Sequence, residues 1–202
     1  MNEIIIGHKI DHLGLWRDGA CSVAFWEEAI QSALASALIP AAEMAVIEIG
    51  YGLGLAHNRL RELSPRKHVL IELDEGLVPK ALSKEVCLIA DRWQSANAAI
   101  SNGIFDAVFF DPDPDEPADD GWTVDRIRHW SLDGYKQLRP KLRRGGRFGF
   151  LDFTGLIAKD PSFCAAVAAL GGSIHRTPFQ ITPPEWCMYA KAGYSDLILI
   201  QK

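Results

Sequence analysis

The chain has 202 residues, of which 48% are hydrophobic and 23% charged, and its formal net charge is −5. This composition excludes a disordered chain, and the acidic balance argues against nucleic acid as a partner. No apolar run reaches the roughly 18 residues of a membrane-spanning helix, and the first residues lack the pattern of a secretory signal. The four cysteines form no closely spaced pair. We therefore expect a single cytoplasmic domain over residues 1–202, with reduced thiols and without a membrane partner.

Short apolar runs alternate with helical patterns along most of the chain, which is typical of parallel βαβ units. Helices are predicted at 22–38, from the glycine-rich turn to about residue 63, from about residue 122 to 142 and at about 161–170. A first buried strand ends at Gly50. Six further strands are predicted at 68–72, 86–90, 105–111, 147–152, 174–176 and 195–200. The pattern predicts an α/β protein with a seven-stranded sheet.

Three glycines, Gly50, Gly52 and Gly54, follow the first strand in the segment VIEIGYGLGLA. Glycines between a strand and a helix let the backbone turn tightly and let a ligand approach without a Cβ in the way. Glu72 ends the next strand, about 20 residues further on, where a carboxylate binds ribose hydroxyls in nucleotide-binding βαβ units. The glycines lack the G-x-G-x-x-G spacing of a dinucleotide site, so NAD is the weaker candidate.

The segments EIGYGLG, IELDE, FDAVFFDP and LRRGGRF resemble, in this order, the motifs of the Rossmann-like, S-adenosylmethionine-dependent methyltransferases. The resemblance implies a doubly wound sheet of seven mostly parallel strands with an antiparallel last strand. It also implies S-adenosylmethionine as the cofactor. The residues that it assigns to cofactor binding are Gly50, Tyr51, Gly52, Gly54, Glu72, Leu73, Trp93 and Asp111. For Trp93, half-buried packing is an equally good interpretation.

Asp111 ends the fourth strand and begins the loop DPDPDEPADDG. Open α/β sheets bind ligands outside the carboxyl ends of their strands, so we expect Asp111 in the active site. Asp111, Asp113 and Asp115 have the spacing of a calcium loop, but the glycine and the final glutamate that calcium needs are missing. From Asp113 onward we therefore expect a solvated acidic loop, which also contains Glu116, Asp119 and Asp120, and no metal site.

The segment PPEWCMY near the C-terminus and the Trp26-Glu27 pair ahead of the glycine turn resemble the guanidinoacetate N-methyltransferase family. The resemblance implies that Asp111 contacts a guanidine and takes its proton, and that Glu27 is a second guanidine-binding carboxylate. Glu28 is adjacent, and a one-residue gap decides which of the two glutamates matches. In this interpretation residues 1–40 form a helical segment over the active site, and residues 41–202 form the cofactor-binding core. The far end of the substrate would lie at Thr154 and Gly155.

These residue types suit a small, cationic guanidino substrate. A guanidinium is a planar cation that attacks poorly while it keeps its proton. One carboxylate can hold it through two parallel hydrogen bonds, and a second can accept its proton. Trp26 and Tyr189 either cover the cationic plane or pack in the core.

Other functions stay open at this point. A protein arginine presents the same guanidino group, and another amine or a hydroxyl can also accept a methyl group. A base in a nucleic acid, a nicotinamide-dependent oxidation and a non-catalytic scaffold are the weaker alternatives. A homodimer is also compatible with the sequence.

Overall fold

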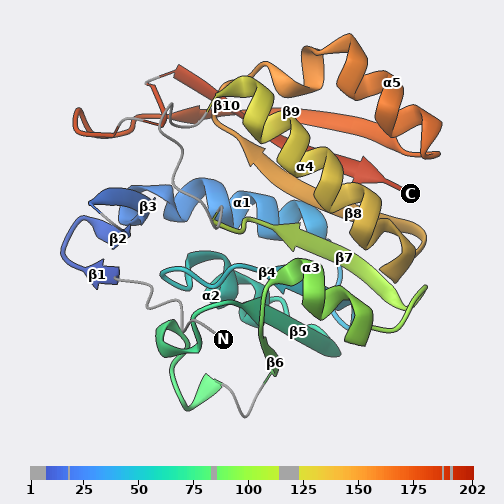
Figure 1. The fold of residues 1–202 in the computed structure, drawn as a ribbon, viewed down its shortest axis with the longest axis horizontal. Helices are drawn as coiled ribbons and strands as arrows, with labels where there is room; N and C mark the ends of the chain where they lie inside the picture. The colour runs from blue at the N-terminus through green and yellow to red at the C-terminus, as the bar shows by residue number, and fades with distance from the viewer. Residues whose placement is uncertain (1–7, 18, 83–85, 114–122, 188, 192) are drawn as a thin grey trace.

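The computed structural model describes residues 8–17, 19–82, 86–113, 123–187, 189–191 and 193–202, and it contains a large and a small sheet (Figure 1). The large sheet has the strand order β6-β5-β4-β7-β8-β10-β9. The pairs along β6-β5-β4-β7-β8 are parallel, whereas β10 is antiparallel to both β8 and β9. Its strands are β4 (Ala45–Ile49), β5 (Lys67–Glu72), β6 (Cys87–Ala90), β7 (Phe105–Phe110), β8 (Leu142–Asp152), β9 (Ser173–Ile181) and β10 (Gly193–Gln201). The predicted α/β fold with an antiparallel last strand is confirmed.

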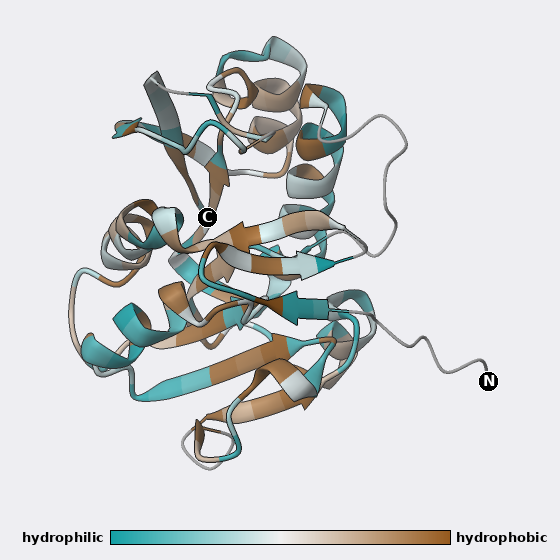
Figure 2. Cartoon of the chain, turned by 90° about the vertical axis from the view of Figure 1, so that its left-hand side faces the viewer, coloured by the Kyte–Doolittle hydropathy of each residue, from teal (hydrophilic) through white to brown (hydrophobic). Residues whose placement is uncertain are grey.

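Helices cover both faces of the large sheet, because its central strands carry apolar side chains on both faces. Successive side chains of a strand point to opposite faces. Val46 and Phe109 pack with α1 and α2, whereas Ile47 and Phe110 pack with α3, α4 and α5. Figure 1 shows α4 running in front of β8, and Figure 2 shows the strands of the sheet coloured largely as hydrophobic. The helices are α1 (Glu28–Leu38), α2 (Leu55–Glu62), α3 (Trp93–Ala96), α4 (Val124–Leu138) and α5 (Pro161–Ala169).

The prediction of a helical segment at residues 1–40 is wrong for much of that region, because its described residues up to Ala24 form strands and turns. β1 (His8–Ile10), β2 (Gly14–Arg17) and β3 (Ala20–Ala24) form an antiparallel sheet, and α1 begins only after the 3-10 turn Phe25–Glu27. A Cβ on Gly14 would lie 2.4 Å from the carbonyl oxygen of Val23, so the close approach of the two strands requires this glycine. The sheet also packs Val23 against Leu55 of α2. This tertiary packing outweighs the helical pattern of residues 22–27.

Two other boundaries differ from the sequence analysis. β8 begins at Leu142 and not at residue 147, and β9 extends to Ile181 and not to residue 176. β9 gains its extra length by pairing with β10 over the whole extent of that strand, whereas Leu142 at the start of β8 pairs with Phe105 of β7. Long-range pairing of this kind leaves no local sequence signal. Among the described residues, no helix has the length and apolarity needed to cross a membrane.

Candidate active site

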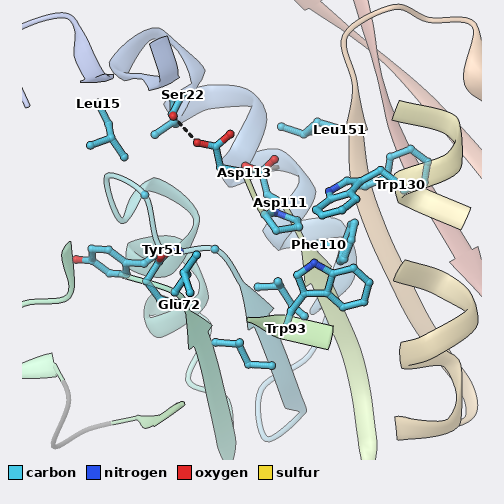
Figure 3. Close-up of a pocket in the computed structure, with 18 of the residues that line it drawn as sticks. Leu15, Ser22, Tyr51, Glu72, Trp93, Phe110, Asp111, Asp113, Trp130 and Leu151 are labelled. Atoms are coloured by element: carbon cyan, nitrogen blue, oxygen red, sulfur yellow. Dashed lines mark hydrogen bonds between the residues drawn. The ribbon is translucent and has the colours of Figure 1, made fainter. Parts of the chain in front are cut away.

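A pocket lies at the carboxyl ends of β4, β5 and β7 (Figure 3). Strand order reverses here, because β4 pairs with β5 on one side and with β7 on the other. Such a switch point leaves a crevice between the loops that leave neighbouring strands. The pocket has about 1340 Å³ of space, open solvent at its mouth included. Its lining comes from both sheets and from α1, α3 and α4.

The glycine turn forms the floor of the pocket. Gly50 has φ +87°, and a Cβ on it would lie 2.4 Å from the carbonyl oxygen of Asp111. Gly52 has φ +54°, and its missing Cβ would lie 3.0 Å from the side chain of Val23. Only glycine combines these backbone angles with such close contacts. Of the predicted turn residues, Gly50, Tyr51 and Gly52 line the pocket, whereas Gly54 caps α2 outside its lining.

Glu72 and Leu73 lie at the edge of the pocket where β5 ends. The Glu72 carboxylate accepts hydrogen bonds from the backbone N–H of Tyr51 at 2.7 Å and of Asp74 at 2.9 Å. These bonds fix the carboxylate beside the glycine turn. Each carboxylate oxygen has a second lone pair, so Glu72 can also accept from ligand hydroxyls.

An aromatic wall borders the pocket on the side of α3 and α4. Trp93 packs edge-on against Phe110 and Trp130, with ring centroids 5.3 and 5.6 Å away. Trp93 therefore packs in the core and lines the pocket as well. In the described part of the chain, the indole N–H groups of Trp93 and Trp130 are buried without a hydrogen-bond partner. The sequence analysis missed Trp130, although its place on an amphipathic helix after the fourth strand was a usable signal.

Two carboxylates meet deep in the pocket. Glu27 is 3% exposed, and its Oε1 accepts hydrogen bonds from the backbone N–H of Ala24 at 2.7 Å and the hydroxyl of Tyr189 at 2.5 Å. The Gln31 amide nitrogen lies 3.4 Å from Glu27 Oε2 and 3.2 Å from Asp111 Oδ2. Gln31 thus connects the two carboxylates. Nothing in the sequence analysis singled it out, although it lies one helical turn after Glu27.

Glu28 points into solvent, so the structure places Glu27 and not its neighbour in the pocket. The turn from β3 into α1 explains the difference. Glu27 accepts from the N–H three residues before it, which turns its side chain inward.

The carboxylates perturb one another. Burial raises the pKa of Asp111 to about 8, and the nearby negative charges of Glu27 and Asp113 add to the shift. Burial also raises the pKa of Glu27, although hydrogen bonds from Tyr189, Ala24 and Gln31 oppose this effect. Burial and the Glu27 charge raise the pKa of Tyr189, which keeps its hydroxyl a donor. At neutral pH Asp111 is therefore largely protonated.

Asp113 was predicted to begin a solvated loop, but polar residues hold it at the mouth of the pocket. Asp113 accepts a hydrogen bond from Ser22, and its Oδ2 lies 3.2 Å from Arg17 Nη1. All three residues line the pocket, and Figure 3 shows Ser22 and Asp113 facing one another beside Asp111. Because β2 and β3 bring Arg17 and Ser22 to this loop, the contact depends on the small sheet that the sequence did not predict. Asp115, Glu116, Asp119 and Asp120 lie outside the described residues.

Besides Glu28, three more predicted substrate-binding residues lie outside the pocket lining, namely Trp26, Thr154 and Gly155. The Asp152 carboxylate accepts hydrogen bonds from the backbone N–H and the hydroxyl of Thr154 and from the N–H of Gly155, so this turn folds onto Asp152. Trp26 packs against Phe153 and Tyr189, with ring centroids 5.8 and 6.2 Å away. Tyr189 itself lines the pocket.

The strand order and the glycine turn define a Rossmann-like methyltransferase, the class that uses S-adenosylmethionine. Two solved structures share the fold. The O-methyltransferase TomG from Streptomyces achromogenes, in complex with SAM, has a TM-score of 0.57 and 16% identity and covers 86% of this chain and 79% of that one. A SAM-dependent methyltransferase from Archaeoglobus fulgidus has a TM-score of 0.54 and 11% identity and covers 87% and 94%.

The family model of guanidinoacetate N-methyltransferase matches residues 12–154, and the chain belongs to this family. Protein arginine N-methyltransferase 2 of Aspergillus fumigatus is 30% identical over 138 residues, which cover 64% of this chain and 30% of that protein. The protein of the same name from Kluyveromyces lactis is 29% identical over 157 residues, which cover 72% and 35%. The chain thus spans about a third of the length of these relatives.

The pocket residues fit the cofactor of this class. Gly50 and Gly52 line the floor of the pocket without side chains, and a Cβ on them would lie 2.4 Å from Asp111 or 3.0 Å from Val23. The unpartnered indole N–H groups of Trp93 and Trp130 are donors without an acceptor within the described protein. Glu72 would hold hydroxyls, and the aromatic wall would hold a flat ring.

Proposed function

We propose that the protein transfers a methyl group from S-adenosylmethionine to a nitrogen of a guanidino group on a small cationic acceptor. The observation that carries this proposal is the pair of carboxylates, Glu27 and Asp111, which share Gln31 inside the pocket. When bound, S-adenosylmethionine would supply a sulfonium methyl group to a nitrogen with a free lone pair, with its carbon–sulfur bond broken and the neutral thioether as the leaving group.

Glu27 is suited to hold the acceptor. Its carboxylate is fixed by donors from Ala24 and Tyr189, which leave lone pairs for a guanidinium. A carboxylate fixed in this way can orient the planar cation through parallel hydrogen bonds. Orientation of this kind can contribute about 7–11 kcal/mol to lowering a barrier, so holding the acceptor still is a large part of the catalysis.

Asp111 is suited to take the proton. Only Gln31, a neutral donor, is seen to hydrogen-bond to its side chain in the described structure. A guanidinium that enters the pocket favours the ionised carboxylate, so Asp111 loses its proton on binding. As the acceptor nitrogen bonds to carbon, it releases a proton, which Asp111 Oδ accepts. Asp111 is thus the general base, and Glu27 holds the acceptor.

An arginine side chain of a protein is the second candidate acceptor. It carries the same guanidino group, and the two curated relatives described above bear the name of protein arginine methyltransferases.

The test is transfer of a labelled methyl group to guanidinoacetate, free arginine, agmatine and an arginine-containing peptide. Wild type is compared with Asp111→Asn, and Asp133→Asn on the exposed face of α4 is the matched control. We expect label on one acceptor class with wild type and the control, and a loss of about 10²–10⁴-fold in Asp111→Asn. Absence of label from every guanidino compound, while the cofactor still binds by equilibrium dialysis, would overturn the proposal.

A further inference from the structure

Gln31 occupies a central position in the pocket that the proposed reaction does not yet explain. It lies on α1 and is 4% exposed. Its amide nitrogen lies 3.4 Å from Glu27 Oε2 and 3.2 Å from Asp111 Oδ2. A side-chain amide has two N–H donors, so one can serve each carboxylate. A single neutral group therefore connects residues of α1, the turn before it and the loop after β7.

The neutrality of Gln31 is the significant property. A lysine or arginine at this position would also connect the carboxylates, but it would cancel one of their charges. The other groups around Asp111 do not supply that charge. Glu27 and Asp113 are acidic, the Tyr189 hydroxyl and the Cys21 thiol are neutral, and Arg17 is paired with Asp113. In the described part of the chain, neither Glu27 nor Asp111 has a lysine or arginine among its hydrogen-bond partners. Arg17 and Arg92 line the pocket elsewhere.

We propose that Gln31 is the positioning residue that makes the pocket selective for a cationic acceptor. It fixes the spacing of Glu27 and Asp111, and because it is neutral it leaves their charge to be balanced by the acceptor. This inference rests on the proposed function, since it concerns how the same pocket chooses its substrate.

Two substitutions separate the geometric part from the charge part. Gln31→Met keeps the length of the side chain but removes both N–H donors. The ionised forms of Glu27 and Asp111 then lose a stabilising hydrogen bond. Gln31→Lys places a cation between them, so it stabilises their ionised forms and competes with the acceptor. The two variants therefore move the pKa of Asp111 in opposite directions, upward for methionine and downward for lysine.

Gln137 offers a matched control. Its amide nitrogen donates to Asp133, four residues earlier on α4, at 3.1 Å on the exposed surface. This pair repeats the Gln31–Glu27 arrangement outside the pocket. Gln137→Met removes an equivalent helical hydrogen bond and leaves the pocket unchanged.

The first experiment follows the carboxyl signal of Asp111 by NMR in protein labelled with ¹³C-aspartate, assigned by its absence in Asp111→Asn. We expect its titration midpoint to rise by about one pH unit in Gln31→Met, the equivalent of one lost hydrogen bond to a charge. It should fall in Gln31→Lys and stay unchanged in Gln137→Met. This readout needs no acceptor, so it holds even where methyl transfer to guanidino compounds fails. An Asp111 midpoint that is the same in wild type and both Gln31 variants would overturn the proposal.

The second experiment measures acceptor selectivity by calorimetric titration with the acceptor identified in the transfer assay, or with agmatine where no transfer is seen. Gln31→Met should bind it about tenfold more weakly, the equivalent of one lost hydrogen bond to a charge, and Gln31→Lys should bind it weakest. Affinity for S-adenosylhomocysteine should change less than threefold in each variant. Equal acceptor binding by wild type and Gln31→Lys would overturn the charge-selection part.

Discussion

Two of the buried acids among the described residues, Glu48 and Asp111, have pKa shifts in opposite directions. Glu48 Oε2 accepts hydrogen bonds from His57 Nδ1 at 2.8 Å and His68 Nε2 at 2.7 Å. Burial raises the pKa of Glu48, but the two imidazoles outweigh this effect and the net shift is downward. By contrast, burial and a neighbouring carboxylate both raise the pKa of Asp111.

The difference shows that the partner, and not the depth of burial, decides what a buried acid does. Glu48 is fully buried between bases on α2 and β5, so its charge is matched inside the protein. Asp111 faces Glu27 and Asp113, and under the proposed function the cationic acceptor would balance its charge. The Glu48 arrangement stabilises the fold beneath the glycine turn. The Asp111 arrangement leaves a buried carboxyl group that, in the proposed function, binds a cationic acceptor.

The largest expected effect is the loss of activity on substitution of Asp111. Asp111→Asn should lower kcat for methyl transfer by about 10³-fold, because the reaction loses its proton acceptor. The same variant should unfold no more easily than wild type in urea at pH 8, because it removes a buried charge with an acidic neighbour. A stable variant with unchanged kcat would show that Asp111 is not the base.

The next largest effect is the loss of stability on substitution of Glu48, which is hydrogen-bonded to two histidines. Glu48→Gln should lower the free energy of unfolding by about 3 kcal/mol, because it breaks a buried charged network. Urea denaturation at pH 7 measures it. The matched control is Glu62→Gln, an exposed acid paired with Arg59, for which we expect less than about 1 kcal/mol. Equal losses in both variants would contradict the assignment of Glu48 to stability.

The pH dependence of stability should separate the two acids by sign. The folded-state pKa of Asp111 is raised to about 8, so the protonated Asp111 contributes stability below pH 4. This contribution is lost as the pH rises toward about 8. A lowered folded-state pKa, as for Glu48, gives stability that is present above its unfolded pKa and lost in acid. Between pH 5 and 8, wild type should therefore lose stability relative to Asp111→Asn. A constant difference between the two proteins across this range would contradict the raised pKa.

The smallest effect distinguishes the two adjacent glutamates. Glu28 is exposed, so Glu28→Gln should change kcat/KM by less than about twofold. Glu27→Gln should lower it by about 10–100-fold, because a hydrogen bond to the charged acceptor is lost. Steady-state kinetics with one acceptor measures both. An equal loss in the two variants would mean that α1 begins elsewhere in solution.

The sequence was sufficient for the parts of the site that lie on the parallel sheet. The glycine turn, Glu72 and Asp111 each follow a strong apolar run, and the switch-point rule brings such strand ends together. Glu27 could be placed only together with Glu28, because the choice depends on a single hydrogen bond from Ala24.

The parts that the sequence missed depend on tertiary contacts. Arg17 and Ser22 reach the pocket through a three-stranded sheet, and the end of its third strand was predicted to be helical. Gln31 is an ordinary polar residue of an amphipathic helix until Asp111 is placed opposite to it. Thr154 and Gly155 were assigned to the substrate, but the carboxylate of Asp152 holds them in a structural turn.

The central claim is that Asp111 keeps a proton until a guanidinium enters, and calorimetry can count that proton. A guanidino acceptor is titrated at pH 7 into protein saturated with S-adenosylhomocysteine, in buffers of different ionisation enthalpy. The slope of binding enthalpy against ionisation enthalpy gives the number of protons exchanged. We predict release of about one proton in wild type and none in Asp111→Asn. Tight binding to wild type without proton release would contradict the claim.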